Sequence, residues 1–569
     1  MTAVRAVRVI TEVGAVDRPF DYSLSEQTTQ THVGDRVRVD FNRRSVRGWV
    51  VGDVEYRTEL KTVTKWLGYG PPPTMIGLLE WASERWYSPL SRFLVSTSPR
   101  RLVTSLPDAP LGEPLEAGVL SGASSFEPGV WQVSPTTDPL ALILGAYEAT
   151  RDVHASLLVL VPTESWANRL RGRLEQRGVH VASGEAQWDR MRAGWPVVVG
   201  SRGAALAPVP RVAGVVIVDA DDEAYRSEMT PTWDAFAMVR ERCRRDDAPW
   251  WATSIVPSPS LVDVAAPRAI EDVSDGWPRV VVVDRRDSDP HEGVLASATL
   301  AAAHRALEGG EPVAVAVVLQ RLGAGRLFAC VKCGELARCG VCGLAEEEVG
   351  SQLACRDRHE LRERFCRSCR STNLKRVRVG VTTLARDVAA QLSQPVTEVT
   401  AASEPTMSLE RVVVGTEAIW QRVRRCGLVI FVDFDQYLLA PRESARRAAL
   451  MAVGKAGRLV GPRQGGHGEV VVQTRRGHDG VIGALESGDM SAIVHGDDET
   501  ARLLGFPPYG ALAEVSGLGA QEYVAQFGAP ISVRSTPNGF DLRAPSVEEL
   551  TSALRASVRP AQKLRVAVH

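Results

Sequence analysis

The strongest constraint on this chain is a cluster of cysteines between residues 330 and 369. It contains one unpaired cysteine, Cys355, and three C-x2-C pairs: Cys330/Cys333, Cys339/Cys342 and Cys366/Cys369. Such a pair forms a tight turn that directs two thiolates at one tetrahedral ion, and two pairs complete a four-cysteine zinc site. Only two of the nine cysteines lie elsewhere, and this clustering favours metal over disulfides in a reducing compartment. We therefore expect a zinc-binding segment here.

The number of ligands in this segment predicts two zinc ions, because seven cysteines exceed what one tetrahedral ion can use. Eight ligands would fill two sites, and Cys355 has no second cysteine beside it. His359 is the nearest substitute, since an imidazole nitrogen ligates zinc readily. The alternative, that His359 is a solvated loop histidine, stays open.

Length and composition describe an ordinary globular protein of several domains. At 569 residues the chain is too long for one core, and we expect three to five domains. Its net charge is -1, so nucleic-acid binding would need local basic patches. No apolar run approaches the roughly 20 residues of a membrane span, and the first 15 residues do not resemble a signal peptide. We expect a cytoplasmic protein that does not bind membranes.

Hydrophobic patterning predicts a multidomain α/β fold. Continuous apolar runs at Leu157–Val161, Val197–Val199 and Gly214–Val218 are typical of parallel strands covered on both faces, and Ser165–Gly178 and Pro231–Arg245 have helical patterns. The predicted units are a β-rich domain (1–105), a linker (106–130), an α/β lobe (131–275), a second α/β lobe (276–325 and 377–480), a zinc-binding insertion (326–376) and a small α+β C-terminal domain (485–569).

The cysteine spacing, inside the second lobe of such a chain, resembles the PriA family of primosomal replication-restart proteins. The resemblance implies two RecA-like helicase lobes around the insertion. In that family the outermost pairs share one ion, which implies one site at Cys330, Cys333, Cys366 and Cys369 and a second at Cys339, Cys342 and Cys355, with His359 as its candidate fourth ligand. The segment Leu504–Tyr509 (LGFPPY) also resembles the start of the last PriA domain.

The N-terminal segment Asp17–Tyr22 (DRPFDY) resembles the opening of the PriA DNA-binding domain, which holds the 3′ end of a nascent strand. By resemblance the residues that contact this end are Phe20, Asp21, Gly34 and Lys61. An aromatic ring can stack on the terminal base, a carboxylate can accept from the 3′ hydroxyl, and a lysine can meet phosphate. The alternative, that Phe20 is core and Asp21 a turn cap, stays open. A basic ribbon suited to phosphate follows: Arg36, Arg38, Arg43, Arg44 and Arg47.

The motifs for ATP hydrolysis are degenerate. The place of the phosphate-binding loop, residues 131–139, has neither its glycines nor its lysine and contains Asp138. In the acidic box Ala220 stands between Asp219 and Asp221 where an acid belongs. The segment Gly454–Arg458 (GKAGR) resembles the remnant of another helicase motif, and we expect Arg458 to be a surface arginine after a tight turn. The resemblance is therefore to the degenerate form of the family found in high-GC actinobacteria.

These observations predict a fork-binding protein of replication restart without ATP-driven unwinding. Its expected partners are DNA forks with a 3′ end at the branch and other restart and replisome proteins, and its expected cofactor is zinc. The alternatives are an active ATP-dependent 3′–5′ DNA helicase with divergent motifs, and a different zinc-ribbon DNA-binding or nuclease-like protein.

Overall fold

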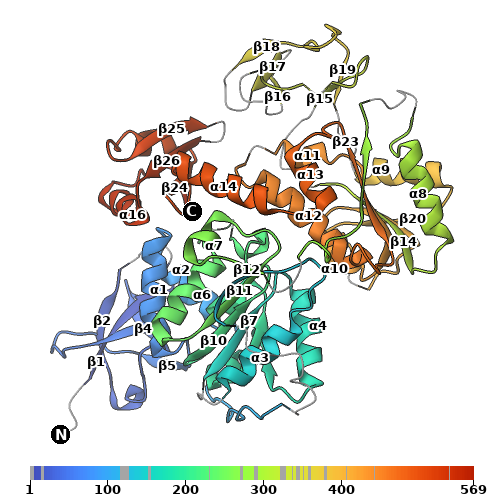
Figure 1. The fold of residues 1–569 in the computed structure, drawn as a ribbon. Coiled ribbons are helices and arrows are strands. Elements are labelled where there is room, and N and C mark those ends of the chain that lie inside the picture. The colour runs from blue at the N-terminus through green and yellow to red at the C-terminus, as the bar shows by residue number, and fades with distance from the viewer. Residues whose placement is uncertain are drawn as a thin grey trace.

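A computed structural model gives the fold of the chain (Figure 1). It describes residues 5–13, 18–115, 127–151, 155–227, 229, 231–269, 273–286, 292–320, 328–335, 337–340, 346–349, 352–355, 360–376, 381–404, 406–440, 442–536 and 539–569. Among these residues no helix is both long enough and apolar enough to cross a membrane.

The N-terminal unit is an antiparallel five-stranded sheet followed by two helices. In sheet order its strands are β2 (Phe20–Ser23), β1 (Ala6–Thr11), β4 (Arg44–Val54), β3 (Arg36–Phe41) and β5 (Lys65–Gly68); η1 (Glu26–Thr28), α1 (Pro73–Arg85) and α2 (Leu90–Thr97) complete the unit. Apolar residues alternate along the strands, so that Val7 and Val9 face one core and Ile10 and Trp49 pack with the helices on the other face.

The first lobe is a parallel seven-stranded sheet with helices on both faces. Its strands, in sheet order, are β12 (Arg268–Ala269), β6 (Gly129–Gln132), β11 (Trp250–Ser254), β10 (Val212–Ile217), β7 (Ser156–Leu160), β9 (Val197–Gly200) and β8 (Val181–Ala182). Its helices are α3 (Leu140–Thr150), α4 (Glu164–Glu175), η2 (Glu185–Gln187), α5 (Trp188–Ala193), η3 (Arg202–Leu206), η4 (Glu223–Tyr225), α6 (Ala235–Asp246) and α7 (Pro259–Val264). In β7, Leu158 and Leu160 enter one core and Leu157 and Val159 the other, which explains the continuous apolar run.

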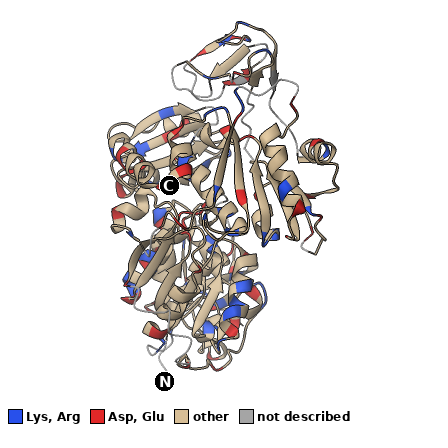
Figure 2. Ribbon diagram, turned by 45° about the vertical axis from the view of Figure 1, so that its right-hand side comes forward, with Lys and Arg blue, Asp and Glu red and all other residues tan. Residues whose placement is uncertain are grey.

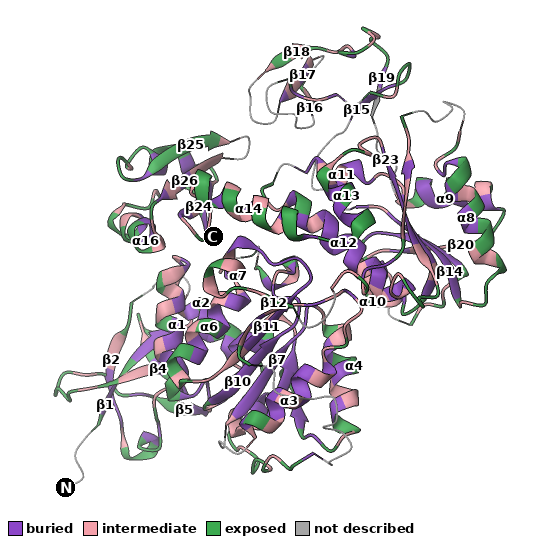
Figure 3. Ribbon diagram, in the orientation of Figure 1, coloured by how far each residue is buried: buried purple, intermediate pink, exposed green. Residues whose placement is uncertain are grey.

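The second lobe is a parallel six-stranded sheet. Its strands, in sheet order, are β13 (Val280–Asp284), β23 (Glu469–Thr474), β22 (Cys426–Phe431), β14 (Val313–Val318), β21 (Val412–Gly415) and β20 (Val396–Val399). The helices are α8 (Ser297–Glu308), α9 (Val381–Leu392), α10 (Ile419–Arg422), α11 (Asp435–Leu438), α12 (Ala445–Val460) and α13 (Gly480–Ser487). Figure 3 shows the strands of both lobes as buried and the outer helix faces as exposed.

The cysteine-rich insertion leaves the second lobe after β14 and returns before α9. It stands apart from both lobes at the top of Figure 1. It contains a two-stranded sheet and a three-stranded antiparallel sheet, made of β15 (Phe328–Cys330) with β19 (Leu374–Arg376), and of β16 (Glu346–Val349), β17 (Gln352–Cys355) and β18 (Leu361–Glu363). We refer to residues 328–376 as the metal module.

The C-terminal unit packs against the N-terminal unit. After α14 (Ser491–Leu504) it forms an antiparallel sheet of β25 (Ser532–Thr536), β26 (Gly539–Ala544), β24 (Ala511–Ser516) and β27 (Arg565–Val568), with α15 (Ala520–Val524) and α16 (Val547–Ala556). The hydroxyl groups of Tyr523 and Tyr87 lie 3.2 Å apart, and Arg559 stacks on the Tyr87 ring. The end of the chain therefore contacts the segment that follows α1.

The predicted fold class is confirmed: an N-terminal antiparallel sheet, two parallel-sheet lobes, a cysteine-rich insertion and a small α+β unit. Helix ends differ from the predicted ones. The helix expected at Pro231–Arg245 begins at Ala235, because the Asp234 side chain accepts from the Ala237 backbone N–H and caps it there. The predicted domain limits stay predictions.

Candidate metal and DNA sites

Two tight turns bring four cysteines of the metal module together. The backbone N–H of Gly334 donates to Cys330 O (2.9 Å), and that of Arg370 donates to Cys366 O (2.9 Å), so the outer C-x2-C pairs form matching turns. The left-handed φ of +73° at Gly334 completes the first turn. The Sγ atoms of Cys330, Cys333, Cys366 and Cys369 all lie within 4.8 Å of one another. Four thiolates at this separation could hold one metal ion.

The second set of predicted ligands is only partly within the described residues. Cys339 and Cys355 are both buried, each with 2% of its surface exposed. Cys342 and His359 lie outside the described residues. A second metal site therefore stays a prediction.

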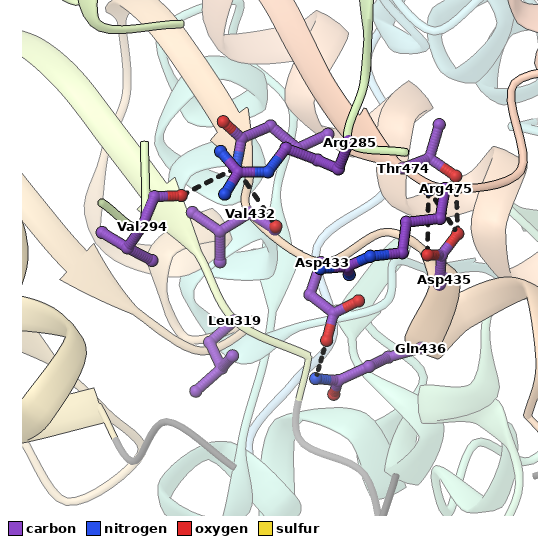
Figure 4. A pocket seen from close by; sticks show the side chains of 10 residues that line it. Arg285, Val294, Leu319, Val432, Asp433, Asp435, Gln436, Thr474 and Arg475 are labelled. Carbon is purple, nitrogen blue, oxygen red and sulfur yellow. Dashed lines mark hydrogen bonds between the residues drawn. The ribbon is translucent and has the colours of Figure 1, made fainter. Parts of the chain in front are cut away.

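A cavity of about 160 Å³ opens at the carboxyl ends of the strands of the second lobe (Figure 4). Arg285 and Arg475 reach it from the ends of β13 and β23, and Asp433 lines it after β22. Burial, with repulsion from Asp435, raises the pKa of Asp433 to about 6. Two arginines and two aspartates balance in charge, so the cavity does not select an anion. Sequence reasoning missed this group, because the strand that Arg475 follows, β23, was not predicted. The signal that could have found it is that carboxyl ends of parallel strands share one edge of a sheet.

Phe20 and Asp21 lie next to each other on β2 and point to opposite faces of the sheet. Asp21 stands opposite Arg8 and pairs with it on the exposed face (Oδ1–Nε 3.0 Å). Phe20 packs on Phe41, with ring centroids 4.9 Å apart, and Arg18 stacks on its ring. One terminal nucleotide would therefore have to wrap the edge of the sheet at β2 to contact both side chains.

Gly34 and Lys61 occupy different surroundings. Gly34 has a φ of +94°, and a Cβ atom there would stand 1.9 Å from Pro71 O, so close packing already requires glycine. Lys61 is exposed, and its carbonyl accepts from the backbone N–H of Ser23, the last residue of β2 (2.9 Å). Of the four predicted 3′-end residues, Phe20 and Asp21 therefore lie on β2 and Lys61 lies beside it, whereas Gly34 is enclosed by Pro71.

The five arginines of the predicted basic ribbon all lie on the β3–β4 hairpin, but only four of them are exposed. Arg38, Arg43, Arg44 and Arg47 are exposed, and Arg43 sits in the tight turn with Asn42 at positive φ. Arg36 is buried instead and donates to Pro99 O (2.9 Å). Outside this hairpin, positively and negatively charged residues are interspersed over the molecule (Figure 2).

The position of the phosphate-binding loop is a compact turn held by its own hydroxyl groups. Ser134 and Thr137 hydroxyls lie 2.9 Å apart, and Thr136 donates to Gly276 O (3.1 Å). The Asp138 carboxylate accepts from the Leu140 backbone N–H at the start of α3 and pairs with Arg173. Asp138 is thus engaged in capping its own helix.

All three aspartates of the degenerate acidic box have protein partners. Asp219 pairs with Arg458 (Oδ2–Nη1 2.6 Å), and Asp222 pairs with Lys455 (Oδ2–Nζ 2.8 Å), both from α12 of the second lobe. The Asp221 carboxylate accepts from the Ser254 hydroxyl (2.7 Å) and the Ser258 backbone N–H (3.0 Å). The expectation of a surface arginine at position 458 was wrong: Arg458 lies within α12, is partly buried and bonds across the two lobes.

Comparison with known proteins supports the resemblance seen in the sequence. Residues 8–99 match the sequence model of the 3'DNA-binding domain (3'BD) of PriA. "Replication restart protein PriA" of Thermotoga maritima is 24% identical over 349 residues, which cover 56% of this chain and 46% of that protein. "Probable replication restart protein PriA" of Mycobacterium tuberculosis is 28% identical over 382 residues, which cover 58% and 57%. The chain thus spans about half the length of the curated relatives it matches.

Solved structures resemble the chain more distantly. The DUF1998 helicase MrfA bound to DNA is 12% identical, with a TM-score of 0.37 over 82% of this chain and 69% of its own. Saccharomyces cerevisiae Dbp5 bound to RNA and ADP BeF3 is 11% identical, with a TM-score of 0.37 over 67% and 85%.

Proposed function

We propose, on the premise that this chain is a PriA-type protein, that it is a cytoplasmic DNA-binding protein of replication restart. It recognises abandoned forks with a 3′ end at the branch and assembles restart and replisome proteins there, without unwinding DNA by ATP hydrolysis. The observation that carries the proposal is the match of residues 8–99 to the 3'DNA-binding domain.

The β2 edge is the proposed contact with the 3′ end. Phe20 is half-buried and carries Arg18 on its ring, so a terminal base can stack beside it. The partly exposed Asp21 carboxylate can accept from the 3′ hydroxyl and would repel a 3′ phosphate. Lys61 and the exposed arginines of the β3–β4 hairpin supply cations for the backbone phosphates. Gly34 contributes by allowing Pro71 to pack against this unit.

The metal module is proposed to hold two zinc ions. Cys330, Cys333, Cys366 and Cys369 would hold the first, supported by four sulfur atoms within 4.8 Å. Cys339, Cys342 and Cys355, with His359, would hold the second. Zinc suits an all-thiolate tetrahedral site. Because the hydrophobic core of the metal module is small, the free energy of zinc binding would supply much of the free energy of its folding.

The absence of ATP hydrolysis is supported by the chemistry at the interface of the lobes. Phosphoryl transfer depends on positioning and on stabilisation of charge, so the phosphate loop, its lysine and the metal-holding acids make up most of the catalyst. Here the loop has no lysine and Pro135 removes one backbone donor. Asp219 and Asp222 are occupied by cations of the protein itself.

The test is ATP hydrolysis by the full-length chain in the presence of fork DNA. We expect turnover below detection, since each missing charged contact costs on the order of 10²–10³ in rate. Turnover that survives Arg458→Ala would indicate a contaminating helicase. Turnover that disappears with Arg458→Ala would support the alternative, an active ATP-dependent 3′–5′ helicase with divergent motifs.

A further inference from the structure

The face between the two lobes, where a nucleotide would bind in a working helicase, is filled by helix α12. Arg458 extends from this helix to the first lobe, where its Nη atoms contact both Asp219 oxygens (2.6 and 2.8 Å) and its Nε donates to Pro135 O (3.0 Å). Its guanidinium also lies over the Trp166 ring, 4.9 Å from the centroid. The Arg458 side chain therefore contacts the acidic box, the position of the phosphate-binding loop and the first turn of α4 at the same time.

A second cation repeats this arrangement one turn earlier on α12. Lys455 Nζ lies 2.8 Å from Asp222 Oδ2. Burial alone would lower the pKa of Lys455, but Asp222 and Glu417 outweigh it, so that its pKa is raised and the ammonium stays charged. Asp219 is completely buried and has a left-handed φ of 52°. Its turn is hydrogen-bonded within the first lobe, through Thr253, and Arg458 supplies the cation beside its carboxylate from the second lobe.

The backbones of the two lobes also meet closely here. A Cβ atom at Gly454 would stand 3.1 Å from Ile255 Cδ1, and one at Gly457 would stand 3.5 Å from Pro135 Cβ and 2.9 Å from Pro278 Cδ. Ile255 and Val256, which follow β11 of the first lobe, are fully buried in the hydrophobic core of the second. Apolar contacts and ion pairs thus close the same face.

We infer that Arg458 and Lys455 lock the two lobes in one fixed closed arrangement that neither requires nor responds to nucleotide. Their cationic groups neutralise the acids that a magnesium nucleotide would otherwise engage. The glycines of α12 let the helix pack against Pro135, at the position of the phosphate-binding loop. The two residues are positioning residues: they fix where the N-terminal unit stands relative to the metal module. This inference concerns the interface of the lobes alone, so it holds or fails independently of fork binding.

Hydrogen exchange of the full-length, zinc-loaded protein tests the lock. In the unmodified protein we expect exchange at residues 133–138, 219–223 and 445–460 to be the same with and without millimolar Mg·AMPPNP. Arg458→Ala should accelerate exchange at residues 219–223 by at least about tenfold, because the turn loses its cationic partner from the second lobe. Arg411→Ala is the matched control, since Arg411 bonds only within the second lobe, to Leu307 O and Gly309 O.

Two results would overturn the lock. One is nucleotide-dependent protection of these segments in the unmodified protein, a measurement that needs no variant to fold. The other is an Arg458→Ala protein whose residues 219–223 exchange as slowly as before. If Arg458→Ala does not fold, Lys455→Met takes its place, because it nearly keeps the length of the side chain and removes the charge. Hydrogen exchange at residue 222 should then accelerate by the same factor.

Discussion

Asp21 is a partly exposed carboxylate on β2 that pairs with Arg8. A 3′ hydroxyl can donate to it, whereas a 3′ phosphate would be repelled. One charge-assisted hydrogen bond should give the unmodified protein a preference of about tenfold for 3′-hydroxyl forks over 3′-phosphate forks. Asp21→Ala should reduce this preference to near unity. Duplex binding and stability should barely change, because exposed ion pairs contribute little. Fluorescence anisotropy measures both affinities.

The control for Asp21 is Asp53→Ala, which breaks a similar exposed pair with Arg5 (2.9 Å) on a neighbouring strand. It should leave end selection unchanged. Equal binding of the two ends by the unmodified protein would mean that the β2 edge is not the 3′-end site.

Cys330 is one of the four cysteines of the proposed thiolate site, and its Sγ lies 3.4 Å from Cys369 Sγ. Cys330→Ser should remove about one zinc ion of two, and should make the metal module susceptible to proteolysis, because the lost ion holds its turns together. Elemental analysis and limited proteolysis report these effects. Cys243→Ala, in α6 of the first lobe, should keep the full zinc content. Freshly purified protein without zinc would contradict the assignment.

Asp433 should make stability depend on pH in the opposite sense to most carboxylates. Its pKa is about 6 in the fold and about 3.9 in an unfolded chain, so the folded state binds the extra proton between these values. The free energy of unfolding therefore falls as pH rises from about 4 to about 6, by at most about 3 kcal/mol, and stays lowered above that.

Asp433→Asn keeps the shape and removes the charge, so it should be more stable than the unmodified protein at pH 7.5 and differ little near pH 4. Urea unfolding at the two pH values measures this. Asp284→Asn should have the opposite effect at neutral pH, because Arg286 holds the pKa of Asp284 below its usual range. A variant Asp433→Asn that is less stable at pH 7.5 would show that the carboxylate is stabilised as an anion.

At the scale of elements, Gly34 determines how the N-terminal sheet meets the segment before α1. Alanine there would combine a φ of +94° with a Cβ atom 1.9 Å from Pro71 O. Gly34→Ala should cost at least about 2 kcal/mol in stability, measured by thermal unfolding, whereas Gly52→Ala, which meets open space, should cost much less. Lost 3′-end selection at unchanged stability would instead indicate that Gly34 contacts DNA.

The regular elements were the part of the fold that sequence could predict. Continuous apolar runs such as Leu157–Val161 correspond to strands covered on both faces, and the outer C-x2-C pairs come together as the family resemblance implied. Contacts between distant segments were not predictable. Arg458 looked like a surface residue because its partner Asp219 is 239 positions away, and nothing local reveals that Pro71 encloses Gly34.

At the scale of the whole molecule, DNA binding depends on local patches, because the net charge is only -1. The exposed arginines of the β3–β4 hairpin should release counterions on contact with phosphate, so fork affinity should fall steeply with salt. Replacing Arg43 and Arg44 by glutamine should reduce the slope of log affinity against log salt by about two. Replacing Arg100 and Arg101, exposed beyond α2, is the control and should leave the slope unchanged. An unchanged slope in the hairpin variant would exclude this ribbon from the DNA contact.

Recognition of the 3′ end and independence from ATP can be measured together in one titration. Full-length zinc-loaded protein is titrated into labelled forks ending in a 3′ hydroxyl or a 3′ phosphate at the branch, each with and without Mg·AMPPNP. We expect tighter binding of the hydroxyl fork, by about tenfold, and identical affinities with and without nucleotide. Equal affinity for both forks, or an affinity that changes with nucleotide, would contradict the proposed function.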